Sequence, residues 1–232
     1  MMTMAYRYIV DHIPETINGI KNRKRPALPM DWETITVHNT GNPRSTARDE
    51  RNWLTNSLNA NNSTGYHLVV DESEVIECIP TWENAYHAGD GANGKGNTTS
   101  VGLEICEVGN FEKTLANAAY LIASMLHSKD KSIKHVDQHN KWNGSNCPRL
   151  LRIGDRWSKF MADIDIQLTL LKSPAKNDVS KNTSHWKYEG IDELARMGLL
   201  NTPEEWKKKI DEPLPVWAGM LILSRIARES IK

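Results

Sequence analysis

The stretch "WETITVHNT", residues 32–40, predicts the strand around which the rest of the chain is expected to fold. Threonines alternate with Ile35 and Val37 along it, which is the period-two pattern of a half-buried strand. The strand is expected to end at His38, so an imidazole stands at a strand end.

Further strands and helices are predicted on the C-terminal side of this stretch. "YHLVVDESEVIECI" (66–79) indicates two strands joined by a tight polar turn, and "SVGLEICEV" (100–108) indicates another strand. Helical spacing of apolar residues predicts helices in residues 46–59, 112–128 and 147–171. Because strands and helices are mixed, the first ~170 residues are expected to form an α/β domain.

The last quarter of the chain has a different composition. "KSPAKNDVSKNTS" (172–184) has no apolar periodicity and is predicted to be a linker. Residues 185–232 are expected to form a small helical domain, with one helix starting at the capping-box pattern of Thr202 and Glu205 around Pro203.

Composition excludes several classes of protein. Among 232 residues, 39% are hydrophobic and 25% charged, which is typical of a soluble globular chain. Lys plus Arg and Asp plus Glu both number 29, so no net field favours nucleic acid or an anionic membrane. No apolar run approaches the roughly 20 residues of a membrane-spanning helix. The first residues lack a secretory signal pattern, so synthesis in the cytoplasm without a signal peptide is expected, and the three cysteines do not resemble a disulfide framework.

A metal site is one interpretation of "DQHNKWNGSNCPRLL", residues 137–151. Zinc takes imidazole and thiolate ligands, and a catalytic site leaves one position for water. His38, His139 and Cys147 could supply three such ligands. The alternative is a polar-loop histidine and an incidental cysteine.

Glu104 interrupts the apolar core of "VGLEIC". An unpaired carboxylate is costly to bury, so its side chain is expected to face either solvent or a polar site. In the second case it could act as a general base that takes a proton from a water molecule activated by the metal.

Five motifs in order carry a family resemblance: "ITVHNTG", "GYHLVVDE", "NAYHAGDG", "NTTSVGLEIC" and "HNKWNGSNCPRLL". Together they resemble the zinc-dependent type-2 N-acetylmuramoyl-L-alanine amidases, which are related to peptidoglycan recognition proteins. The likeness is greatest to phage endolysins and to autolysins of Bacillus-like bacteria. The resemblance covers about residues 30–165 and implies a mixed central sheet flanked by helices, within a catalytic domain of residues 1–171. Residues 185–232 are expected to be a cell-wall-binding module.

Carried over by position, the resemblance implies one Zn²⁺ held by His38, His139 and Cys147, with Glu104 activating the water. It also suggests substrate contacts at four positions, which are Tyr66, His67, His87 and Ser145. At Ser145 most relatives have a lysine that stabilises the oxyanion. A hydroxyl can donate a hydrogen bond there but brings no charge.

The implied function is hydrolysis of the amide between N-acetylmuramic acid and L-alanine in bacterial peptidoglycan. A phage or prophage endolysin, released through a holin-type pore, is expected; no nucleic-acid partner and no membrane insertion are expected. A host autolysin, a catalytically inactive recognition protein and a cysteine hydrolase using Cys147 and His139 stay open as alternatives.

Overall fold

A computed structural model of the chain describes residues 6–17, 19–172, 191, 194–195 and 202–208. The chain divides into two compact units, Met1–Pro174 and Ala175–Lys232. Of the second unit only the helix α7, Pro203–Lys208, is described as a whole element, and it begins at the proline of the predicted capping pattern. The predicted linker and most of the predicted C-terminal domain lie outside the described residues.

A six-stranded mixed sheet forms the centre of the first unit, in the order β1-β6-β5-β7-β4-β8. The β5–β6 hairpin is antiparallel, whereas all other neighbours pair in parallel. The strands are β1 Arg7–Val10, β4 Thr34–Asn39, β5 Leu68–Val70, β6 Glu74–Glu77, β7 Ser100–Ile105 and β8 Val136–Gln138. A separate two-stranded ladder pairs β2 Thr16–Ile17 with β3 Ile20–Lys21. The predicted mixed sheet flanked by helices is therefore confirmed.

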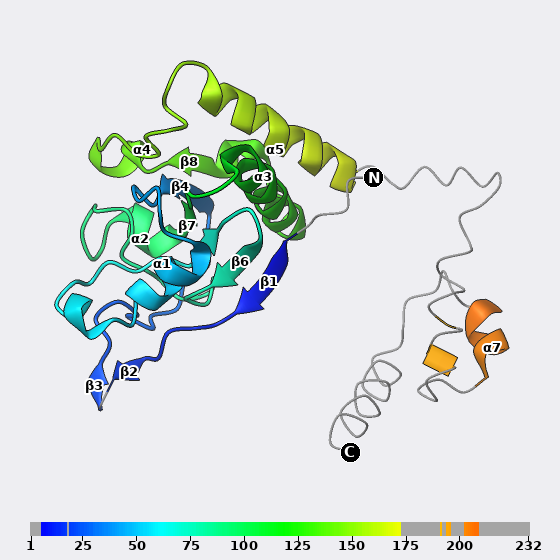
Figure 1. Cartoon of the computed structure of the whole chain (residues 1–232), viewed down its shortest axis with the longest axis horizontal. Helices are drawn as coiled ribbons and strands as arrows, with labels where there is room; N and C mark the ends of the chain where they lie inside the picture. The colour runs from blue at the N-terminus through cyan, green and yellow to red at the C-terminus, as the bar shows by residue number, and fades with distance from the viewer. Residues whose placement is uncertain (1–5, 18, 173–190, 192–193, 196–201, 209–232) are drawn as a thin grey trace. The chain divides into compact units, whose positions relative to one another are not determined.

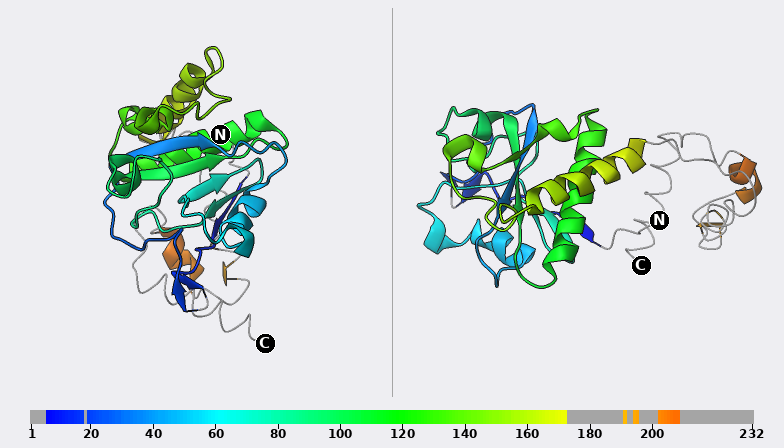
Figure 2. Two further views of the ribbon diagram at one scale, coloured as in Figure 1. Left: turned by 90° about the vertical axis from the view of Figure 1, so that its left-hand side faces the viewer. Right: turned by 90° about the horizontal axis from the view of Figure 1, so that it is seen from above.

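Two long helices cover one face of this sheet (Figures 1 and 2). They are α3, Phe111–Ser128, and α5, Arg156–Lys172, and they pack on each other and on the aliphatic residues of the central strands. Along β7 this face receives Val101, Leu103 and Ile105, all fully buried. Full burial of each such side chain stabilises the fold by about 1.5–3 kcal/mol.

The opposite face of β7 presents Gly102 and Glu104, because side chains alternate along a strand, and Cys106 follows directly after the strand. Here the short helix α1, Ala47–Trp53, covers part of the sheet with a second apolar cluster that includes Cys106. Glu104 lies between this cluster and the carboxyl end of β4. Apolar cover therefore stops where the predicted site begins.

Two local predictions differ from the structure. The predicted helix 46–59 ends at Trp53, since the Asn56 side chain accepts the backbone N–H of Leu58 and starts a 3₁₀ turn, leaving Leu58 90% exposed. The last helix begins at Arg156 rather than near Pro148, because Gly154 adopts a left-handed conformation (φ 58°) that ends the preceding turns.

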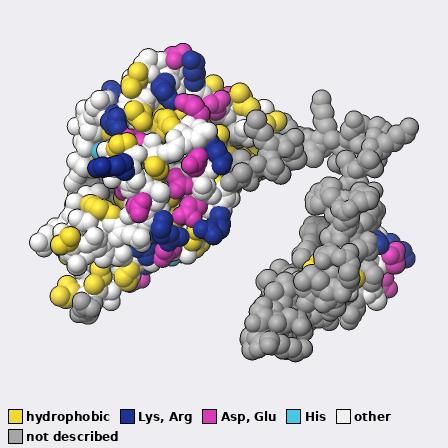
Figure 3. Space-filling view, viewed as in Figure 1, with side chains coloured by type: hydrophobic (Ala, Val, Ile, Leu, Met, Phe, Trp, Pro, Cys, Tyr) yellow, Lys and Arg dark blue, Asp and Glu magenta, His cyan; other side chains and the backbone are white. Residues whose placement is uncertain are grey.

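The Gly- and Asn-rich stretch of residues 87–100 contains a short helix, α2 Lys95–Thr99. Among the described residues no helix is long and apolar enough to cross a membrane. Figure 3 shows acidic and basic side chains interspersed over the viewed face of the first unit, in line with the balanced composition.

Candidate active site

The parallel strands β4 and β7 place His38 and Glu104 directly opposite each other as register partners. Strand β8 pairs in parallel with the other edge of β4 and ends at Gln138, so that His139 follows immediately. The carboxyl ends of parallel strands lie at one edge of a sheet, which is the usual place for a ligand site in such folds. Two histidines and a carboxylate distant in sequence thus meet at this edge.

A tight loop brings Cys147 to the same place. The helix α4, Asn140–Asn143, ends at Gly144 in a left-handed conformation (φ 76°), which reverses the chain. The backbone N–H of Asn140 donates to the carbonyl oxygen of Cys147 at 2.9 Å, and the Asn140 side chain donates to that of Ser145 at 2.7 Å. These bonds close the loop and set the thiol beside the strand ends.

The three predicted metal ligands lie together. Their candidate ligand atoms are all within 4.8 Å of one another, and Cys147 Sγ lies 3.9 Å from His38 Nδ1. Tetrahedral zinc with its usual bond lengths separates nitrogen and sulfur ligands by about 3.6 Å. The donor set and its spacing therefore fit one zinc ion after a small movement of the side chains.

His139 has two neighbours at its other ring nitrogen. Nε2 lies 3.0 Å from the carbonyl oxygen of Ala88 and 3.0 Å from Nδ2 of Asn143. If Nε2 carries a hydrogen, it donates to the carbonyl oxygen of Ala88; if it carries a lone pair, it accepts from the amide of Asn143. Metal binding at Nδ1 requires the proton on Nε2 and therefore selects the bond to Ala88.

Glu104 is held in an environment that favours its protonated form. Its Oε1 lies 3.9 Å from His38 Nδ1, and its buried Oε2 has no hydrogen-bond partner among the described residues. Burial, and then the nearby charge of Glu50, raise the pKa of Glu104 to about 8. This pKa is that of the metal-free site; a cation bound beside the carboxyl would favour its charged form, which could accept a proton and return it.

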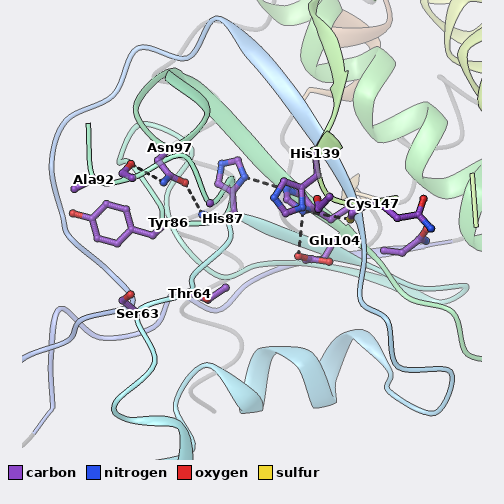
Figure 4. Close-up of a pocket in the computed structure, with 15 residues that line it drawn as sticks. Ser63, Thr64, Tyr86, His87, Ala92, Asn97, Glu104, His139 and Cys147 are labelled. Atoms are coloured by element: carbon purple, nitrogen blue, oxygen red, sulfur yellow. Dashed lines mark hydrogen bonds and ion pairs between the residues drawn. The ribbon is translucent and has the colours of Figure 1, made fainter. Parts of the chain in front are cut away.

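The site opens into a pocket of about 700 Å³ (Figure 4). Sequence reasoning missed the wall away from the strand ends. That wall includes Ser63, Thr64, Tyr86, Ala92 and Asn97. Tyr86 precedes His87 in the "NAYHAGDG" motif, but no pattern in the sequence pointed to Ser63 or Thr64.

Ser145, one of the predicted substrate contacts, does line this pocket. Its Oγ is buried and has no hydrogen-bond partner within the described part of the chain. A hydroxyl in that state is available as a donor to a group that enters the pocket.

Tyr66 and His67 do not line the pocket, contrary to the suggestion that they contact substrate. The Tyr66 hydroxyl donates to the backbone carbonyl of Glu50 in α1 at 2.8 Å. His67 is fully buried, with Nε2 2.8 Å from the carbonyl oxygen of Glu83 and Nδ1 accepting the backbone N–H of Gly102 at 2.9 Å. Both side chains are therefore used inside the protein.

His87 does line the pocket, but both of its ring nitrogens are engaged by the protein. Nδ1 lies 3.1 Å from Nε2 of His38, and Nε2 lies 2.9 Å from the carbonyl oxygen of Ser100. This leaves no nitrogen for a substrate, which differs from the predicted role.

Comparison with known proteins agrees with this arrangement. A family model described as N-acetylmuramoyl-L-alanine amidase matches residues 28–150. The amidase CwlH of Bacillus subtilis (strain 168) is 38% identical over 175 residues, which cover 72% of this chain and 69% of CwlH. The catalytic domain of XlyA superposes with a TM-score of 0.61 at 38% identity, covering 68% of this chain and 99% of that one. A structure described as a mutant endolysin from Bacillus subtilis gives a TM-score of 0.61 at 37% identity, covering 68% and 99%.

The site combines two imidazoles, a thiol and a buried carboxylate at the edge of a mixed sheet, beside an open pocket. These groups are those of a hydrolase with a site suited to a metal ion. The chain belongs to the N-acetylmuramoyl-L-alanine amidase family, and its activity is that of a peptidoglycan amidase.

Proposed function

We propose that this chain is a zinc-dependent amidase that hydrolyses the bond between the lactyl group of N-acetylmuramic acid and L-alanine of the stem peptide. One observation carries the proposal: the ligand atoms of His38, His139 and Cys147 lie within 4.8 Å of one another. Glu104 stands directly opposite His38 on the neighbouring strand. This is the set of groups that hydrolysis of an unactivated amide requires.

The metal would be held by the two imidazoles and the Cys147 sulfur. When bound, zinc supplies Lewis-acid polarisation of the scissile carbonyl and lowers the pKa of water. Family membership supports zinc as the ion, and the nitrogen and sulfur donors suit zinc better than Mg²⁺ or Ca²⁺, which prefer oxygen.

Proton transfer and stabilisation of the oxyanion are assigned to residues of the protein. Glu104 accepts a proton from the attacking water as its oxygen bonds to the carbonyl carbon. It then delivers that proton to the nitrogen of L-alanine as the carbon–nitrogen bond breaks, so the products are a muramic-acid carboxylate and a free amine. The Ser145 hydroxyl would donate to the developing oxyanion; its position in the pocket lining and the lack of a hydrogen-bond partner among the described residues support this role.

A cysteine hydrolase is the competing chemistry at the same residues. Burial raises the pKa of the Cys147 thiol to about 11, which leaves little thiolate for nucleophilic attack in the absence of a metal. The Cys147 sulfur also lies 3.9 Å from Nδ1 of His38, so the thiol faces both imidazoles and is not paired with His139 alone. These observations support the amidase over a Cys147–His139 pair.

Digestion of purified cell walls tests the proposed reaction. We expect new N-terminal L-alanine and no new reducing sugar ends, because an amide rather than a glycosidic bond is cut. Dialysis against a strong chelator should remove more than nine-tenths of the activity, and added Zn²⁺ should restore it. Full activity after the metal has been removed would support the cysteine hydrolase and refute the zinc amidase.

Ser145→Ala should lower the rate of hydrolysis less than removal of the metal does. One neutral donor to an oxyanion contributes less than a charged one, so we expect the rate to fall by about 5- to 50-fold with unchanged zinc content. Ser145→Lys, which restores the residue of most relatives, should keep or raise the rate. If Ser145→Ala is as active as the unaltered protein under single-turnover conditions, Ser145 has no part in the reaction.

We propose a role in lysis, as a phage or prophage endolysin released through a holin-type pore. The similarity to an endolysin from Bacillus subtilis supports it. A host autolysin is the alternative, supported by the similarity to CwlH. A gene for a pore-forming protein beside this one would favour the first, and its absence would favour the second. A wall-binding role for residues 185–232 stays a prediction from the sequence.

A further inference from the structure

Two consecutive hydrogen bonds hold the ring of His38 on its Nε2 side, opposite the Nδ1 atom that faces Cys147. His38 Nε2 lies 3.1 Å from His87 Nδ1, and His87 Nε2 lies 2.9 Å from the carbonyl oxygen of Ser100. Both imidazoles are buried. The last acceptor, the carbonyl oxygen of Ser100, is a backbone atom of β7 and cannot rotate away as a side chain could.

The direction of both hydrogen bonds follows from the carbonyl oxygen of Ser100. A carbonyl oxygen only accepts, so His87 Nε2 must carry a hydrogen. In the neutral ring, Nδ1 of His87 is then a lone pair and must accept from His38. His38 therefore carries its hydrogen on Nε2, which leaves the lone pair of its Nδ1 facing Cys147 Sγ, 3.9 Å away.

We propose that His87 is a positioning residue, which sets the tautomer and the ring orientation of His38 so that Nδ1 is ready to bind the metal. This inference rests on the proposed zinc site and assigns His87 a role other than substrate contact. Partners of this kind, behind a ligating histidine, fix the ring and raise its basicity as a ligand.

The surroundings of His87 hold its own ring in one place. Asn97 Oδ1 accepts the backbone N–H groups of His87 and Ala88, each at 2.8 Å. A Cβ at Gly102 would lie 2.5 Å from His87 Cγ, so this position of β7 leaves the ring its space. The ring of His67 packs edge-on against it at 5.6 Å between centroids.

Neutral rings are required for these two hydrogen bonds, because an added proton would place two N–H groups against each other across the 3.1 Å between His38 Nε2 and His87 Nδ1.

Two substitutions separate positioning from simple space-filling. In His87→Asn the amide oxygen takes the place of Nδ1 and keeps an acceptor for His38, whereas His87→Leu fills the space with no acceptor. By chelator competition we expect His87→Leu to bind Zn²⁺ about 10- to 100-fold more weakly, and His87→Asn to stay within about threefold of the unaltered protein. His127→Leu, at an exposed position of α3, is the matched control and should not change zinc affinity.

A direct measurement uses the metal-free, full-length protein labelled with ¹⁵N at histidine. We expect the His38 proton on Nε2, with a scalar coupling across the hydrogen bond to His87 Nδ1. A His38 proton on Nδ1, or equal zinc affinity for His87→Leu and the unaltered protein, would overturn the inference even if the protein proves to be a zinc amidase. If the protein binds no zinc at all, the proposed function fails, while the tautomer measurement still reports on the hydrogen bonds. If His87→Leu does not fold, the labelled protein and His87→Asn decide the question.

Discussion

Glu104→Gln is expected to lower the rate of peptidoglycan hydrolysis by a factor of about 10² to 10⁴ while the protein stays folded and keeps its metal. Glutamine has nearly the same volume as glutamate but cannot accept a proton at neutral pH. Since Glu104 faces the metal site from β7 without being one of the three predicted ligands, its loss should affect the chemical step and not the binding of zinc.

The stability of this variant gives an independent check. The pKa of Glu104 is raised to about 8 in the folded protein, above the 4.5 of an unperturbed glutamate. Folding therefore favours the protonated form, and the contribution of Glu104 to stability decreases as the pH rises from 4.5 to 8. At pH 8 the metal-free Glu104→Gln protein should accordingly unfold at a temperature no lower than the metal-free parent.

The measurement is the initial rate on purified walls at equal protein concentration, together with zinc content by elemental analysis. Glu33→Gln, at an exposed position just before β4, is the matched control and should retain full activity. If Glu104→Gln with a full complement of zinc keeps the parent rate, Glu104 has no part in proton transfer.

The strands and long helices could be predicted because the spacing of apolar residues along the sequence indicates each of them. The strand carrying His38 is predicted from alternation, the hairpin of residues 66–79 from two strand-like runs joined by a polar turn, and α3 from its apolar face. The pairing of His38 with Glu104 was not visible, because 60 residues lie between the two strands and no local pattern sets a parallel register. Only the family resemblance brought them together beforehand.

The roles of Tyr66, His67 and His87 could not be obtained from their positions in the motifs. All three occur in motifs of the resemblance, yet the direction of a side chain depends on what packs beside it. Tyr66 points to Glu50 in α1, and His67 and His87 bond to backbone carbonyls. A histidine near an active site is consistent with substrate contact or with support of another residue, and only the hydrogen-bond partners distinguish the two.

Cys147→Ser is expected to lose tight zinc binding and, with it, at least about 99% of the hydrolytic activity. A thiolate is among the strongest protein ligands for zinc, whereas a serine hydroxyl stays protonated and binds weakly. A ligand that binds only the folded state at 100 times its dissociation constant stabilises that state by about 2.7 kcal/mol. Zinc should therefore raise the melting temperature of the parent protein and leave that of Cys147→Ser nearly unchanged.

The zinc-dependent shift in melting temperature also separates the metal enzyme from a cysteine hydrolase, because both would lose activity in Cys147→Ser. Cys106→Ser is the matched control: its thiol is buried in the apolar cluster beneath α1, so this change should lower the melting temperature itself but preserve the increase on adding zinc. Differential scanning calorimetry with and without Zn²⁺ measures both quantities. An equal zinc-induced increase in the parent and in Cys147→Ser would exclude Cys147 as a ligand, and no increase in the parent would exclude a stabilising zinc site at these three residues.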